Sequence, residues 1–414
     1  MPLNKVIIVG AGPTGLILGL LLARQGIHVD ILDAGATLDK QPRAAHYASP
    51  AAYELDRAGI LDDVTARGIN HKKMVWRKID TDIVATMRLD RMPEERKRHS
   101  MVVLPLGQLG EILYGHLQRQ ATASVRWSHK VVKVGQEECM AWVDVETRNG
   151  KKRFEADYVL GCDGANSTVR RELFGPGYPG ETLNAQLVAT NVYYNFDRYN
   201  YTDTNFIIHP KNFYMAARIT SDGLYRVTYS DTPGLTREEY IARQPSRYQE
   251  ILPGNPKPGD YQITNISPYR MQQRCAPSFR VGRVVLAADA AHVCNPFGGL
   301  GLTGGIADAG SLFDALMGIH LGLSDDSILD KYSEVRRKTW SDVIDPASRE
   351  NFRRLHEQEA NNARENDVFF RLCVKAEGDE GLARELAMGL EVLRHDMTQY
   401  YNKKPDTVNV RSKL

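Results

Sequence analysis

The fold is decided by residues 5–33, which read KVIIVGAGPTGLILGLLLARQGIHVDILD. Val6 to Val9 form a short β-branched run that stops at a glycine, which is typical of a strand buried on both faces. A glycine-rich turn, Gly10 to Gly15, follows at once, and Leu16 to Arg24 favours a helix. A second apolar strand, His28 to Leu32, is followed by an acid. This order of strand, glycine turn, helix, strand and acid predicts a dinucleotide-binding unit.

Each residue of the turn has a physical task in such a site. Gly10 permits a tight turn, Gly12 allows the backbone to approach a pyrophosphate, and Gly15 allows the helix to pack closely on the strand. The helix directs free N–H groups and its positive dipole end at the phosphate. Asp33 is placed to bind an adenosine ribose and to repel a 2′-phosphate, which favours FAD or NAD over NADP. The predicted cofactor residues of this unit are Gly10, Gly12, Pro13, Thr14, Gly15 and Asp33.

Length and composition indicate a globular protein of two domains. The chain has 414 residues, of which 42% are hydrophobic and 25% charged, and a formal net charge of +2. This charge gives no reason to expect a nucleic acid or an anionic membrane as partner. Five cysteines without CxxC spacing favour neither disulfides nor a zinc site, so we expect no metal and a cytoplasmic location. The first strand begins too early for a signal peptide, and Leu16 to Ala23 is too short to span a membrane.

Two later stretches also carry an acid at the end of a buried strand. Tyr158 to Gly161 leads to Asp163, and Ser167 is expected to cap the helix that follows. Residues 282–305 contain a strand that delivers Asp289, then a glycine-rich loop and another helix. Open α/β sheets bind ligands at the carboxyl ends of such strands, and the loop offers backbone N–H groups to an anionic or electron-rich ring edge.

Between about Gly180 and Tyr269 the pattern changes from helical to alternating, which predicts an antiparallel sheet. Ser221-Asp222-Gly223 is expected to form a hairpin turn within it. A smaller meander is expected from Val125 to Ala156, with a type I′ turn at Asn149-Gly150. The sequence therefore predicts a nucleotide-binding domain that carries a second, antiparallel domain.

Three motifs in order over residues 1–320, GAGPTG, CDGANSTVR and AADAAHVCNPFGGLGLTGG, resemble the single-component FAD-dependent aromatic hydroxylases. These flavoprotein monooxygenases include para-hydroxybenzoate hydroxylase and phenol hydroxylase, and the likeness is greatest to fungal-type relatives without a thioredoxin-like domain. The resemblance implies that NADPH or NADH reduces FAD, that O2 adds to it, and that a flavin C4a-hydroperoxide hydroxylates a phenolic or related aromatic compound. Since a second glycine fingerprint is absent, we expect NAD(P)H to dock transiently.

The predicted fold class is α/β (α+β): a Rossmann-like FAD-binding domain with an inserted antiparallel β-sheet substrate domain and C-terminal helices. The expected boundaries are 1–75, 100–180 and 270–320 for the FAD-binding domain, 76–99 and 181–269 for the substrate domain, and 321–414 for the C-terminal helical region. The C-terminal helices are expected to pack against the FAD-binding domain, with a dimer surface as the alternative. The protein is therefore expected to be a monomer or a homodimer with a small aromatic substrate and no membrane span.

Carried over by motif, the resemblance implies further FAD contacts outside the first unit. Asp163 would serve both FAD and the nicotinamide donor, Asp289 the ribityl chain, and Pro296 the reaction side of the ring. One departure is visible, because the family usually has glycine where this chain has Ala288. The further FAD residues implied by the resemblance are Arg43, Gln108, Asp163, Asp289, Pro296, Gly301, Leu302 and Thr303.

The group that activates the substrate is left open by the sequence. His209, Tyr225, Arg218 and Arg226 are the candidates for binding or deprotonating a phenol. Strand alternation groups Phe213, Met215, Tyr225, Val227 and Tyr229 on one apolar face, which favours Tyr225, and it groups Arg218 and Arg226 on the opposite face. Matching the hairpin to para-hydroxybenzoate hydroxylase favours Arg218 instead. Alternative outcomes of the same flavin chemistry are epoxidation, Baeyer–Villiger insertion and dearomatising hydroxylation, and a flavin dehydrogenase or reductase is a further alternative.

Overall fold

The two strands of the first motif are neighbours in a six-stranded sheet, and the helix between them packs on that sheet. The structure is a computed structural model that describes residues 2–39 and 44–402. The strands follow the order β18-β19-β12-β1-β2-β8, and all neighbours are parallel except the β18–β19 pair. These strands are β1 (Lys5–Val9), β2 (His28–Leu32), β8 (Ala123–Arg126), β12 (Tyr158–Gly161), β18 (Arg280–Val281) and β19 (Val284–Leu286). The mixed fold with a Rossmann-like sheet is confirmed.

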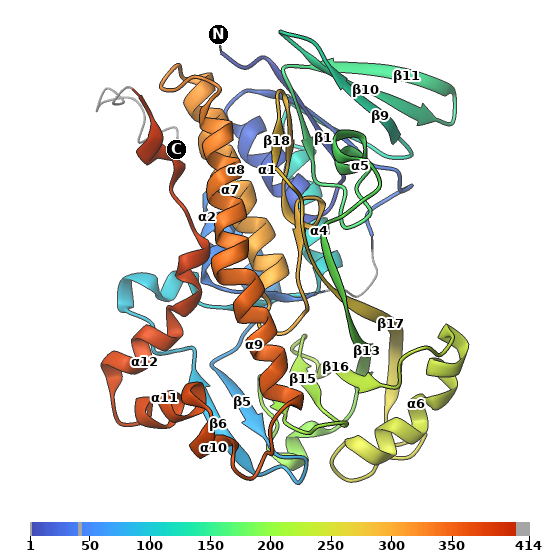
Figure 1. The fold of residues 1–414 in the computed structure, drawn as a ribbon, viewed down its shortest axis with the longest axis vertical. Helices are drawn as coiled ribbons and strands as arrows, with labels where there is room; N and C mark the ends of the chain where they lie inside the picture. The colour runs from blue at the N-terminus through green and yellow to red at the C-terminus, as the bar shows by residue number, and fades with distance from the viewer. Residues whose placement is uncertain (1, 40–43, 403–414) are drawn as a thin grey trace.

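Helices cover this sheet and close the core around it. Helix α1 (Pro13–Arg24) is buried along almost its whole length because α4 (Leu106–Leu117) and α7 (Leu300–His320) pack against it. Helix α7 in turn lies beside α8 (Ile328–Thr339), as Figure 1 shows. The other helices of this region are α2 (Ser49–Arg57), α3 (Leu61–Arg67) and α5 (Thr168–Phe174). Among the described residues no helix is both long and apolar enough to cross a membrane.

Two small sheets flank this region. One contains β3 (His46–Tyr47), β7 (Val102–Val103) and β4 (Ile69–Asn70); the other contains β9 (Lys130–Gln136), β10 (Ala141–Thr147) and β11 (Gly150–Ala156). The predicted meander is therefore present, but the predicted type I′ turn is wrong. Thr147 pairs directly with Gly150, so Arg148 and Asn149 are the central residues of the turn. A type I′ turn needs positive φ at both central residues, but here the positive φ, +99°, is at Gly150.

A second, eight-stranded sheet has the order β20-β17-β13-β16-β15-β14-β5-β6. Its strands are β5 (Lys73–Arg77), β6 (Ile83–Arg88), β13 (Gly180–Tyr193), β14 (Thr204–Ile207), β15 (Tyr214–Arg218), β16 (Leu224–Asp231), β17 (Gln262–Cys275) and β20 (His292–Val293). All neighbours are antiparallel except β14 and β5. The hairpin at Ser221-Asp222-Gly223 is confirmed, with Gly223 at a φ of +91°. The domain boundaries stay a prediction.

The two faces of this sheet pack against different partners. One face contacts α6 (Arg237–Ile251), whose first turn is closed by a capping box between Thr236 and Glu239. The other face contacts Phe297, which follows β20, and the C-terminal helices. We call the first the α6 face. The second we call the flavin-loop face, after the loop of residues 294–299 that is predicted to lie at the flavin. Figure 1 shows α6 at the lower right, at a distance from the six-stranded sheet.

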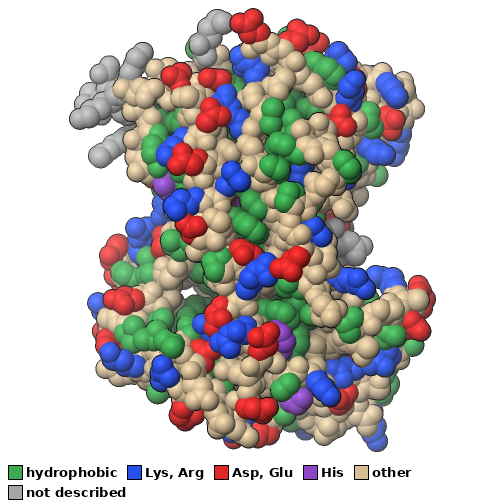
Figure 2. All heavy atoms as spheres, viewed as in Figure 1, with side chains coloured by type: hydrophobic (Ala, Val, Ile, Leu, Met, Phe, Trp, Pro, Cys, Tyr) green, Lys and Arg blue, Asp and Glu red, His purple; other side chains and the backbone are tan. Residues whose placement is uncertain are grey.

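The C-terminal helices were expected to pack against the FAD-binding domain, but some of them pack against the eight-stranded sheet. Helix α8 lies against α7, as predicted, but Leu355, Phe370 and Cys373 join the core of the flavin-loop face with Trp76. That part of the prediction is wrong because an apolar stripe does not reveal which sheet it covers. These helices are α9 (Asp345–His356), α10 (Ala363–Asn366), α11 (Val368–Ala376) and α12 (Glu380–Ala387), and a π-helical turn, Trp340–Ile344, joins α8 to α9. Figure 2 shows that the molecule narrows between its two lobes, and that charged side chains of both signs are spread over the side in view.

Candidate active site

The glycine turn after β1 has the geometry that its sequence predicts. Gly10 has a φ of +104°, and a Cβ there would collide with the carbonyl of Cys162 at the end of β12. A Cβ on Gly15 would collide with the Gly10 carbonyl, so this glycine permits the close approach of α1 to the turn. A Cβ on Gly12 would meet no described atom within 4 Å. The turn is therefore closed toward the sheet and open at Gly12, as a pyrophosphate requires.

Asp33 closes the same turn from the second strand. Its Oδ2 accepts a hydrogen bond from the N–H of Ala11 at 2.7 Å, and its Oδ1 accepts one from the N–H of Gly35 at 2.7 Å. The carboxylate thus lies at the edge of the glycine turn, which is where a bound adenosine ribose would meet it.

The third motif brings a second helix N-terminus to this region. Gly299 has a φ of +66° and precedes α7, and the Thr14 hydroxyl in α1 donates to the Gly305 carbonyl in α7 at 3.3 Å. The Thr303 hydroxyl and the Asn295 side-chain nitrogen are buried without a hydrogen-bond partner among the described residues. Such groups are costly unless a ligand satisfies them, so the chain here fits a polar ring edge such as that of FAD.

The other predicted FAD residues come from several segments of the chain. Asp289 and Pro296 are exposed, and Gln108 is half-buried in the first turn of α4. Asp163 has a structural task, because its carboxylate accepts hydrogen bonds from Ser167 Oγ at 2.5 Å and from the N–H of Thr168 at 2.7 Å. Gly301, Leu302 and Thr303 form the first turn of α7. Arg43 lies outside the described residues. The individual FAD contacts stay predictions.

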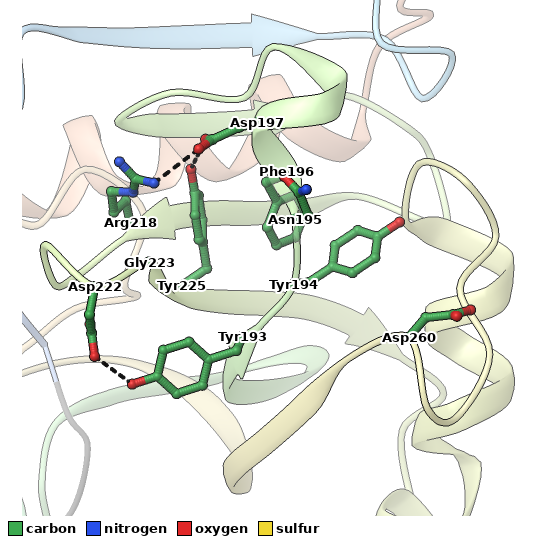
Figure 3. A pocket seen from close by; sticks show the side chains of 10 residues that line it. All are labelled: Tyr193, Tyr194, Asn195, Phe196, Asp197, Arg218, Asp222, Gly223, Tyr225 and Asp260. Atoms are coloured by element: carbon green, nitrogen blue, oxygen red, sulfur yellow. Dashed lines mark hydrogen bonds and ion pairs between the residues drawn. The ribbon is translucent and has the colours of Figure 1, made fainter.

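Two of the four candidates for substrate activation lie on the α6 face. Tyr225 is 1% exposed and donates a hydrogen bond from its hydroxyl to the Tyr201 carbonyl at 3.1 Å. Arg218 pairs with Asp197 at 3.2 Å. Figure 3 shows both side chains directed at Asp197, in a hollow of about 400 Å³ that none of the predicted FAD residues lines. His209 lies just after β14, and its Nδ1 accepts hydrogen bonds from the N–H groups of Lys211 and Asn212.

The predicted grouping of side chains by strand alternation is wrong. Tyr225 pairs with Arg218 and Val227 with Ala216, whereas Met215 pairs with Thr228. Side chains of directly paired residues share a face, so Met215 lies on the opposite face from Tyr225. Phe213 also packs in the flavin-loop core, at 6.1 Å between ring centroids from Phe297. Arg218 and Arg226, predicted to share a face, therefore lie on opposite faces.

Arg226 is the candidate that lies on the flavin-loop face of the sheet. Its Nε donates to Asn191 Oδ1 at 2.6 Å, and it is close enough to His46 for its charge to lower the pKa of that histidine. His46 lies in β3, which packs against α7, and its ring reaches Thr204 in the substrate sheet. The Thr204 hydroxyl lies 3.3 Å from His46 Nε2 and 3.0 Å from His71 Nδ1.

A family model for an FAD-binding domain matches residues 4–347 of the chain. Para-nitrophenol 4-monooxygenase of Pseudomonas sp. (strain WBC-3) is 34% identical over 94% of this chain and 96% of that protein. The 6-hydroxy-3-succinoylpyridine 3-monooxygenase HspB of Pseudomonas putida is 36% identical over 86% of this chain and 90% of that protein. The crystal structure of p-nitrophenol 4-monooxygenase PnpA from Pseudomonas putida superposes with a TM-score of 0.89 at 34% identity, covering 95% of this chain and 99% of that one.

The chain belongs to the FAD-dependent aromatic hydroxylases. It is an enzyme of the flavoprotein monooxygenase type, and the resemblance of its three motifs is confirmed. A structure of aklavinone-11 hydroxylase with FAD and aklavinone has a TM-score of 0.76 at 21% identity, which shows the shared fold. The particular likeness to fungal-type relatives stays a prediction.

The electrostatics of the hydroxylase's flavin-loop face are set by burial. Burial, then the neighbouring His71 and Arg226, lower the pKa of His46 well below its usual value of 6.5. Burial lowers the pKa of His71 to about 4. Both imidazoles are therefore neutral at physiological pH, and burial also lowers the pKa of the Arg226 guanidinium from its ordinary value. The face thus combines a buried cation with two neutral bases.

Sequence reasoning missed His46, His71 and Thr204 in this hydroxylase. They come from three segments that are separated by at least 25 residues, and no local spacing connects them. Arg226 was named among the candidates, and correct strand pairing would have placed it on the flavin-loop face. The register of the β15–β16 hairpin was therefore the usable signal.

Proposed function

We propose that this aromatic hydroxylase acts on a small single-ring phenol, held as its phenolate against Arg226 and His46, with NADH or NADPH as electron donor and O2 as oxygen source. The observation that carries the proposal is the position of Arg226, largely buried on the sheet face that meets the flavin loop. The similarity to para-nitrophenol 4-monooxygenase over nearly the full length of both chains supports a substrate of this size class.

Residues of both helix ends would hold FAD in this site. The glycine turn at residues 10–15 and the N-terminus of α1 would bind the pyrophosphate, and Asp33 the adenosine ribose. The first turn of α7, with the Thr303 hydroxyl, would meet the electron-rich edge of the flavin ring. Bound FAD, once reduced, supplies the activation of O2 that no amino-acid side chain provides.

Arg226 and His46 would divide the work on the substrate oxygen. The buried guanidinium stabilises a phenolate, which lowers the pKa of the bound phenol and enriches its ring in electrons. The neutral His46 accepts the proton that the phenol releases. Because the Thr204 hydroxyl lies within hydrogen-bond distance of both imidazoles, it can hold the His46 ring in one orientation for this task.

The test is product analysis with isotopically labelled oxygen. The purified protein, loaded with FAD, is incubated with NADH or NADPH, ¹⁸O2 and para-nitrophenol or other single-ring phenols. We expect nucleotide oxidation that accelerates with the phenol, and a product that has gained one ¹⁸O atom. A product without added oxygen would contradict the proposal in favour of a dehydrogenase or reductase. An epoxide or a ring-inserted oxygen would keep the cofactor assignment and contradict hydroxylation.

A further inference from the structure

The residue that precedes Asp289 has an unusual backbone. Ala288 leaves strand β19 with a φ of +54°, in the left-handed region. An alanine is disfavoured there because its Cβ comes close to its own carbonyl oxygen, so surrounding structure has to hold the conformation. The left-handed residue turns the chain sharply out of the sheet, and Asp289, next in sequence, is exposed. The direction of Asp289 thus depends on how residue 288 is held.

A buried carboxylate holds it. Asp308 in α7 is 0% exposed, and its Oδ2 accepts a hydrogen bond from the Ala288 N–H at 2.9 Å and contacts His292 Nε2 at 2.8 Å. Its Oδ1 accepts from Arg336 Nε at 2.6 Å, and Arg336 is itself 1% exposed. Burial acts to raise the pKa of Asp308, but Arg336 and His292 lower it to about 2, so the carboxylate is ionised. A buried, paired anion therefore fixes the Ala288 N–H in one direction.

Space for the Ala288 methyl group comes from Gly305, one turn before Asp308 on α7. A Cβ added to Gly305 would lie 2.7 Å from the Ala288 Cβ and 3.3 Å from the Ala288 Cα. Real Cβ atoms do not approach this closely, so either Ala288 or α7 would have to move. Gly305 also binds Thr14, in the first turn of α1, through its carbonyl. The Ala288 methyl group thus fits against α7 because residue 305 has no Cβ.

We propose that Ala288 and Gly305 form an obligatory steric pair, fixed by Asp308, that directs Asp289 at the cofactor and so sets how tightly this hydroxylase holds FAD. Asp308 and Gly305 are positioning residues in this scheme, because they act through Ala288 and Asp289. The inference rests on the assignment of Asp289 to FAD within the proposed function, and it does not depend on the identity of the substrate.

The test is a double-mutant cycle on FAD binding. The FAD dissociation constant is measured by titrating deflavinated protein, for wild type, Gly305→Ala, Ala288→Gly and the double variant. We expect Gly305→Ala to weaken FAD binding at least tenfold, Ala288→Gly to bind within threefold of wild type, and the double variant to return to within threefold. Visible circular dichroism of the bound flavin should change in Gly305→Ala and recover in the double variant. This spectral recovery reports the orientation of the cofactor and not merely the stability of the fold.

Gly304→Ala is the matched control on the same helix. Its added Cβ would meet Ile344 Cδ1 at 2.9 Å and not Ala288, so Ala288→Gly should not relieve any defect it causes. The proposal is overturned if Gly305→Ala binds FAD as wild type does, or if Ala288→Gly leaves its defect unchanged. It is also overturned if the same rescue appears with Gly304→Ala.

The cycle separates this inference from the proposed function. Its readouts are the affinity and spectrum of FAD, which need no substrate. Loss of the steric coupling in an enzyme that still adds ¹⁸O to a phenol overturns the pair alone. Intact coupling in an enzyme that hydroxylates no phenol supports the pair and contradicts the substrate proposal.

Discussion

Both faces of the eight-stranded sheet carry polar side chains, but these side chains differ in type and in what they contact. On the α6 face, tyrosines fill the core and bind one another or the backbone: the hydroxyls of Tyr201 and Tyr214 lie 2.9 Å apart, and that of Tyr225 donates to a carbonyl. On the flavin-loop face, His46, Thr204 and Arg226 meet beside α7. The difference teaches that a polar aromatic side chain in a substrate domain is evidence of a site only when its face is known.

The largest effect is expected from the core of the α6 face. Tyr214→Ala should lower the free energy of unfolding by about 3–5 kcal/mol, because it removes a fully buried ring. Denaturant unfolding measures this loss. The folded fraction should still bind FAD and a phenol normally, and a selective loss of phenol binding would contradict the division between the two faces.

The next effect concerns the pH dependence of stability. The pKa of His71 is lowered from 6.5 to about 4, so its contribution to stability is present above pH 6.5 and is lost as the pH falls through 4. Relative to His71→Gln, the wild type should lose about 1.4 kcal/mol per pH unit in this window, or about 3 kcal/mol in total. Unfolding curves at several pH values measure the difference. Parallel profiles for the two proteins would show that His71 is not buried as a neutral base.

Arginines at 226 and 218 offer a direct comparison of the faces. Arg226→Gln should weaken binding of para-nitrophenolate by about 1.5–3 kcal/mol, or roughly 10- to 150-fold, because a charge-assisted hydrogen bond is lost. Flavin absorbance changes on titration measure the dissociation constant. Arg218→Gln is the control, since its guanidinium pairs with Asp197 on the other face, and should leave binding unchanged. A larger effect at 218 would restore the sequence-based candidate.

The smallest effect tests the tyrosine that the sequence favoured. Tyr225→Phe should cost about 0.5–1.5 kcal/mol of stability, because its hydrogen bond to the Tyr201 carbonyl is lost, and should leave turnover unchanged. Tyr229→Phe is the matched control. The Tyr229 hydroxyl is buried without a hydrogen-bond partner among the described residues, so its removal should cost nothing. A fall in turnover of Tyr225→Phe with FAD still bound would return Tyr225 to the active site.

The cofactor end of the molecule was predictable because its determinants are contiguous. Gly10, Gly15 and Asp33 lie within one βαβ unit. A Cβ at either glycine would collide with nearby backbone atoms, and Asp33 accepts a hydrogen bond from the Ala11 N–H of the same turn. The substrate end was not predictable in the same way. In the β15–β16 hairpin Tyr214 pairs with Tyr229 and Met215 with Thr228, so counting alternation without the register assigned Met215 to the wrong face.

His46 could not be found from the sequence at all. It reaches the substrate sheet from a two-residue strand that is 158 positions away from Thr204, its partner there. A single histidine among alanines has no periodicity and no motif, and only tertiary packing gives it a task. The same holds for Gly305, which reads as one glycine among several until Ala288 is seen beside it.

The two longest strands bring together the start and the end of the chain segment that supplies most of the substrate sheet. Strands β13 and β17 run antiparallel along each other, with Gly180 beside Arg274 where the chain enters and leaves. Figure 1 shows this pair connecting the two lobes. Because entry and exit are neighbours, residues between them can be lengthened, shortened or replaced without altering the order of strands in the nucleotide-binding sheet. Residues 180–274 supply five of the eight strands of the substrate sheet, whereas β5, β6 and β20 come from elsewhere in the chain. Because β14 pairs with β5, a replacement of this segment in enzyme engineering has to keep the edge of β14 that β5 contacts.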